Sequence, residues 1–140
     1  MPRLFDDGEK LIIQNIFEND TATLPAEVDV GLYDSAEDIL EDSAQPTDVS
    51  SEPSGNAYER QSLSLDSTGF TSSQEDGDWQ AASDTIEFDL SNDNTGQVDR
   101  YFIVYEDEGE KMFFDGELSR VYDLEIVDIL EVQNKGLSLT

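Results

Sequence analysis

Carboxylates dominate this sequence and limit the conditions under which it can fold. Its 140 residues include 34 Asp and Glu against 7 Lys and Arg, a formal net charge of −27. Repulsion on this scale destabilises a compact chain in dilute buffer, but at molar salt the Debye length falls to about 3 Å and most of the repulsion is screened. Apolar residues alternate with the acids in several stretches. We therefore interpret the chain as a folded protein of halophilic origin rather than an acidic mesophilic domain with two disordered loops.

The same composition removes whole classes of function. Without His or Cys, the chain has no disulfide, thiolate zinc site, cysteine nucleophile or Ser-His-Asp triad. Among so many acids, pairs of carboxylates arise by chance, so they do not indicate a glycosidase, and we expect no enzymatic activity. Seven basic residues are few for binding phosphates, and no apolar run reaches the ~18 residues that span a bilayer. We expect neither nucleic acid nor membrane as a partner, and the first ten residues show no signal-peptide stretch.

The N-terminal segment has the periodicity of an amphipathic helix. Apolar residues recur at offsets of three and four over residues 4–17, and Asp6 and Glu9 lie where a helix N-terminus favours acids. This helix, within a segment of residues 1–20, packs either on its own sheet or on a neighbouring subunit.

Residues 21–140 alternate between polar and apolar side chains over short stretches bounded by turn residues. We expect strands at 27–33, 58–65, 85–90, 98–105, 111–118, 122–126, 129–132 and 136–140. The continuous apolarity around residues 101–105 favours a strand that is buried on both faces. The pattern predicts a mainly β fold, an antiparallel β-sandwich or barrel of about seven short strands with one N-terminal helix.

Two stretches lack this alternation and are rich in Ser, Asp and Glu. Residues 34–57 and 66–84 are expected to be long acidic loops that face solvent. The second contains Phe70 and the single tryptophan, Trp79, which either anchors the loop on the core or forms part of a ligand site.

Some turn residues could hold a cation through hard oxygen donors. The weak candidates are Asp76, Asp78, Asp89, Asn92, Asp93 and Asn94. They are either solvated turn residues or a loose site for Na⁺, K⁺, Mg²⁺ or Ca²⁺. No other cofactor is expected. The sequon at Asn19 lies at the expected end of the helix, where it would be exposed.

The order of these segments resembles a known family. After the helix, Pro25 and Ala26 lead into a strand, a Glu-x-x-Gly-x-x-Tyr-x-Arg-Gln segment spans residues 52–61, and residues 114–119 carry a Gly-x-Leu step. This layout is similar to that of small virion structural proteins of haloarchaeal tailed viruses and related tailed phages. In that family such proteins are described as head decoration, turret, minor capsid or tail-fibre components.

The resemblance implies a structural role. We expect a capsid decoration or turret protein, a homo-oligomer that binds other virion proteins such as the major capsid protein and is assembled in the host cytoplasm. The alternative is a tail-fibre or baseplate component, or a receptor-binding module. Arg60 should pair with a carboxylate, within the subunit or across an interface. Candidate interface residues are Leu4, Phe5, Ile12, Ile13, Ile16, Phe17, Tyr58, Arg60, Tyr101, Ile103, Tyr105 and Phe113.

Overall fold

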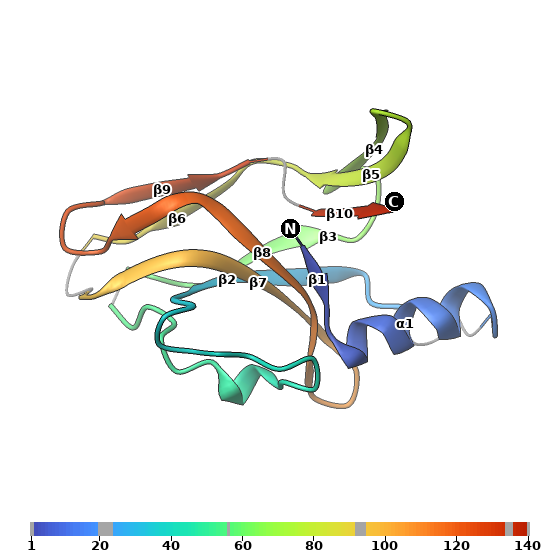
Figure 1. Ribbon diagram of the computed structural model, residues 1–140, viewed down its shortest axis with the longest axis horizontal. Helices are drawn as coiled ribbons and strands as arrows, with labels where there is room; N and C mark the ends of the chain where they lie inside the picture. Colours follow the sequence, from blue (N-terminus) through green and yellow to red (C-terminus); the bar gives the residue numbers. More distant parts are fainter. Residues whose placement is uncertain (1, 20–23, 56, 92–94, 134–135, 140) are drawn as a thin grey trace.

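The structure, a computed structural model, describes residues 2–19, 24–55, 57–91, 95–133 and 136–139 (Figure 1). It is mainly β, with one α-helix in this part of the chain and antiparallel sheets, as the sequence predicted. Its elements are β1 (Arg3–Leu4), α1 (Asp6–Ile16), β2 (Glu27–Tyr33), the 3-10 helix η2 (Pro46–Asp48), β3 (Gln61–Ser64), β4 (Phe70–Glu75), β5 (Asp78–Ser83), β6 (Ile86–Asp89), β7 (Gln97–Glu106), β8 (Glu110–Asp123), β9 (Ile129–Val132) and β10 (Gly136–Leu139).

The first layer is a five-stranded antiparallel sheet in the order β1-β8-β7-β2-β3. Strand β7 lies at its centre, where Ile103 pairs with Val30 of β2 and Phe114 of β8. Tyr101 to Tyr105 are all buried, which confirms that this strand is covered on both faces. The two strands expected at 111–118 and 122–126 are one continuous strand, β8, which ends at Asp123 and is followed by a turn.

The second layer is a long two-stranded ribbon widened at one end by β4. Ile86 of β6 pairs with Val132 of β9, and Ala82 of β5 pairs with Gly136 of β10. The β5–β10 pairing therefore continues the β6–β9 pairing without a shift in register. Figure 1 shows β6 continuing into β5 above the first layer. The prediction of a loop over residues 66–84 was wrong, since β4 and β5 form a hairpin there. Asp76 and Gly77 make its two-residue turn with positive φ, a known hairpin signal.

Alternate side chains of both layers form the main core. It joins Val30, Leu32 and Tyr101 of the first layer to Phe88 and Leu130 of the ribbon, and each is almost completely buried. Tyr101 and Phe114 meet edge to face, with ring centroids 6.3 Å apart. This packing between layers explains why the polar and apolar alternation in the sequence has period two.

The opposite face of the five-stranded sheet is covered by the chain between β2 and β3. Tyr33, Phe102 and Met112 pack there against Leu40 and Ala44, and this segment runs along the lower side of the sheet in Figure 1. Residues 34–57 therefore form a cover for the sheet, contrary to the expectation of a loop facing solvent along its whole length. Buried apolar residues spaced along the acidic stretch, among them Pro46 and Pro53, make this possible.

Helix α1 packs on β8 and projects beyond the sheets (Figure 1). It begins at Asp6, because Arg3 and Leu4 pair with β8 as β1, so the helix is shorter than the predicted 4–17. The backbone approach is close: a Cβ added at Gly8 would lie 2.1 Å from the Phe113 carbonyl oxygen. The described residues contain no helix long and apolar enough to cross a bilayer.

Candidate functional site

The side chains of Glu52, Tyr58 and Arg60 come together in one ion-pair centre. The Arg60 guanidinium donates to both Glu52 oxygens at 3.0 Å and also reaches Glu110 at 3.1 Å. The Tyr58 hydroxyl donates to Glu52 Oε2 at 2.7 Å. Arg60 therefore has its carboxylate partner within the subunit, which was one of the two alternatives.

This centre also fixes the chain on the edge of the sheet. The Tyr58 hydroxyl accepts a hydrogen bond from the Leu32 amide at 3.1 Å, while the Arg60 guanidinium lies 5.2 Å from the centre of the Phe102 ring. Burial, together with the charge of Glu52, raises the pKa of Tyr58 above its ordinary value. A neutral phenol that donates to a carboxylate and accepts from the backbone is suited to holding β3 in place.

A second ion-pair centre lies under the cover and was missed by sequence reasoning. Asp115 is completely buried and accepts hydrogen bonds from Arg3 Nη2 at 2.8 Å and from the Tyr33 hydroxyl at 2.5 Å. Arg100 approaches its other oxygen at 3.4 Å and donates to the Tyr33 oxygen at 3.0 Å. Arg3 also donates to the Leu40 carbonyl at 2.7 Å. The centre thus links β1, β2, β7 and β8 to the cover.

Burial and the hydrogen bond to Asp115 raise the pKa of Tyr33, so the phenol stays neutral. Two guanidinium groups face the single carboxylate, and buried charges are tolerated only with such partners. The sequence held one signal of this centre. Asp115 follows Met112, Phe113 and Phe114 in a strand, where an acid is unexpected unless it is paired.

A third group of polar contacts holds the cover together. Asp38 is buried and accepts hydrogen bonds from the backbone amides of Ser50 and Ser51 at 3.0 and 2.8 Å and from both hydroxyls. Burial by itself would raise the pKa of Asp38, but these hydrogen bonds outweigh it and lower the pKa. The carboxylate therefore joins the two ends of the covering segment.

The candidate interface residues divide into covered and exposed groups. Five of them are buried within the subunit, namely Phe5, Tyr101, Ile103, Tyr105 and Phe113, and four are half-buried, namely Leu4, Ile12, Tyr58 and Arg60. By contrast, Ile13 is 48% exposed, Ile16 68% and Phe17 76%. All three belong to the projecting end of α1, and for them the interface role stays a prediction.

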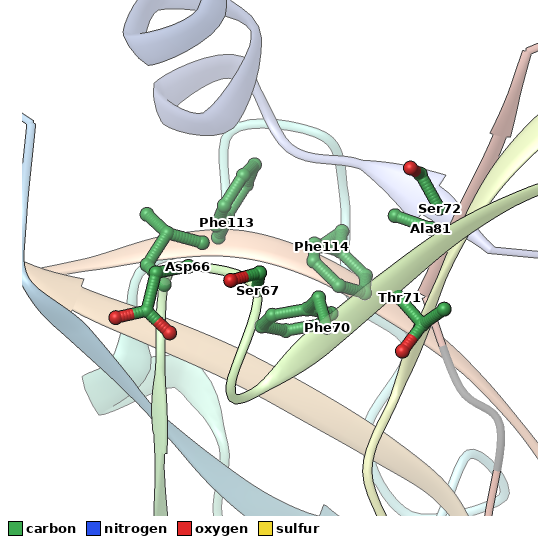
Figure 2. A pocket seen from close by; sticks show the side chains of 9 residues that line it. Asp66, Ser67, Phe70, Thr71, Ser72, Ala81, Phe113 and Phe114 are labelled. Atoms are coloured by element: carbon green, nitrogen blue, oxygen red, sulfur yellow. The ribbon is translucent and has the colours of Figure 1, made fainter.

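An apolar pocket lies beside this helix. It has a volume of about 540 Å³, and Figure 2 shows Phe113 and Phe114 of β8 facing Phe70 at the start of β4. Ser72 and Ala81 of the hairpin line its other side. Phe70 is thus half-buried in the pocket, whereas Trp79 on β5 is 57% exposed and is not an anchor on the core.

The cation candidates do not come together. Asp76 lies in the turn of the β4–β5 hairpin and Asp78 begins β5, whereas Asp89 lies at the end of β6 and accepts hydrogen bonds from Ser91. Asn92, Asp93 and Asn94 lie outside the described residues. Within the described part of the chain, no group of three or more acids is placed to hold a metal ion.

Taken together, these observations define a β protein with an exposed apolar helix end, an apolar pocket and arginines that are paired within the chain. The family model of podophage GP4 fiber I protein gp80 matches residues 5–140. The chain belongs to this family, so it is a fibre-type virion component of a tailed virus. No curated protein and no solved structure matches the chain.

Proposed function

We propose that this chain is a tail-fibre component that assembles as a homo-oligomer and binds other virion proteins. The match to a fibre family over residues 5–140 carries this proposal and favours the fibre position over the capsid decoration or turret position. The exposed apolar end of α1 supplies a surface for assembly. The role is structural, and needs no catalytic group, nucleic acid or membrane.

The disposition of the basic side chains supports a protein partner rather than nucleic acid. Arg3, Arg60 and Arg100 are three of the seven basic residues, and all three are engaged with carboxylates of the same chain. Few cations are left to replace the counterions of a phosphate backbone.

Gold-labelled antibodies against the chain, applied to purified virions, test the position. We expect the label on the tail. Label spread over the head would instead support the decoration position, and intact particles without label would contradict a virion role.

We further propose that the protein works at high salt, in a virus of a salt-loving archaeon. The charge of −27 supports this, because screening removes most of the self-repulsion at molar salt. Circular dichroism and mass determination in molar salt and in dilute buffer test it. We expect a folded oligomer in molar salt and a loss of folding or assembly on dilution. Equal stability of a compact monomer in nearly salt-free buffer would contradict it.

A second candidate, host recognition, is favoured by the exposure of Trp79. Exposed aromatic rings often contribute to binding sites, and Trp79 lies on β5 of the hairpin, is 57% exposed and is not among the residues of the main core. Replacing Trp79 with Ala should then lower adsorption of virions to host cells while leaving the oligomer mass unchanged. Unchanged adsorption would rule this candidate out.

A further inference from the structure

One surface of this very acidic chain has almost no carboxylates. Residues 10–17 of the helix region, 67–74 around β4 and 79–83 of β5 contain no Asp or Glu. The average of 34 acids in 140 residues would place about five in these 21 positions. Like charges facing each other across a contact are destabilising, so a surface without acids is where another acidic molecule can approach.

These segments without Asp or Glu lie around the apolar pocket. Phe70, Ser72 and Ala81 line it from the hairpin side, and α1 lies close by beyond Phe113 (Figure 2). Among the residues that line the pocket, Asp66 is the only charged one. The pocket and the exposed helix end therefore form one apolar surface with few charges.

Strand β4 adds an open edge to this surface. It pairs with β5 on one side, and no other described strand pairs with it. The Phe70 amide donates to Asp66 rather than to β5. Because amide directions alternate along an antiparallel strand, the amides of Ser72 and Gln74 also point away from β5. Thr71 to Gln74 are exposed and include neither the proline nor the charge that usually protects an edge strand.

We propose that a second copy of this chain docks on this surface, with its β4 adding antiparallel to β4 of the first copy. The charge of the chain is the reason for proposing a second copy as the partner. A basic partner would favour the acidic faces, whereas a partner of charge −27 needs a contact with few carboxylates. A two-fold axis would place the same surface on both copies and bring the exposed end of α1 and the pocket into the contact. The inference rests on the proposed function and specifies how its oligomer forms.

Light scattering after size-exclusion chromatography in molar salt tests the proposal. Ser72→Pro removes an amide that points outward and leaves the pairing with β5 intact, while Ser72→Ala at the same position keeps that amide. Phe17→Ser removes an apolar side chain from the surface. Ile126→Ser is its matched control, because Ile126 is similarly exposed at 78% and lies in the turn between β8 and β9, outside this surface.

We expect Ser72→Pro and Phe17→Ser to halve the measured mass or to raise the dissociation constant at least tenfold. Ser72→Ala and Ile126→Ser should keep the wild-type mass, and circular dichroism should show all four variants folded. A wild-type mass for both folded surface variants would overturn the inference and leave the proposed fibre role intact. A monomeric wild type would overturn the inference together with the homo-oligomer. If Ser72→Pro does not fold, Phe17→Ser alone decides the test. A folded Phe17→Ser variant with the same mass as the wild-type protein would then also overturn the inference.

Discussion

Replacing Asp115 with Asn tests whether the buried ion-pair centre holds the cover on the sheet. Asp115 is fully buried, and Arg3, Arg100 and Tyr33 all contact its carboxylate. The variant removes the charge but nearly preserves the shape of the side chain. Two guanidinium groups then lose the carboxylate that compensates their partial burial.

Loss of one partner from a buried pair costs about 3 to 5 kcal/mol. The Arg3 side chain is 34% exposed and can regain water, so we expect the lower end of this range, about 3 kcal/mol. With a urea m-value of about 2 kcal/mol per M for a small protein, the unfolding midpoint should fall by about 1.5 M.

Urea unfolding at high salt, followed by circular dichroism, measures this loss. Asp42→Asn is the matched control, since Asp42 approaches the same guanidinium at 3.9 Å but is 71% exposed. Both variants reduce the net negative charge by one, so relief of overall repulsion is equal in the two. An exposed pair contributes about 0 to 1 kcal/mol. Equal midpoints for the two variants would refute the role assigned to Asp115.

Two further predictions concern the helix and the cover. Gly8→Ala should destabilise the protein by about 1 to 3 kcal/mol through overpacking, because its Cβ would meet the Phe113 carbonyl oxygen; an unchanged melting temperature would contradict this. The lowered pKa of Asp38 stabilises the fold above the ordinary carboxyl pKa of about 4, and this contribution is lost as the pH falls through the folded value. Ser51→Ala should therefore lower the free energy of unfolding at pH 7. It should also make this free energy decrease less as the pH falls. An acid-unfolding curve parallel to that of the wild type would contradict this prediction.

The alternation of polar and apolar residues was enough to predict β2 at its observed bounds, most other strands and the antiparallel class. It was not enough for β4 and β5, whose side chains are mostly Ser, Thr, Gln and Ala and are held by ladder hydrogen bonds more than by burial. The Asp-Gly pair at residues 76 and 77, where both φ angles are positive, is the sequence signal of this hairpin, whereas the interpretation of Asp76 as a solvated turn residue or weak cation ligand did not predict the two strands beside it.

For the candidate site, the sequence revealed the partnership of Arg60 with a carboxylate and the apolar face of α1. It could not reveal that Asp115 meets Arg3 from 112 positions away, because such contacts depend on how the strands are ordered in the sheet.

Apart from the β4–β5 hairpin, local pattern thus determined the helix and most of the strands of this protein, since backbone periodicity acts over neighbouring residues. The tertiary structure alone decided which apolar side chains stay uncovered. Tyr101 and Phe17 are both aromatic residues in apolar runs, yet Tyr101 is 1% exposed and Phe17 is 76% exposed. The difference arises because β7 lies between the ribbon and the cover, while α1 extends past the edge of both layers.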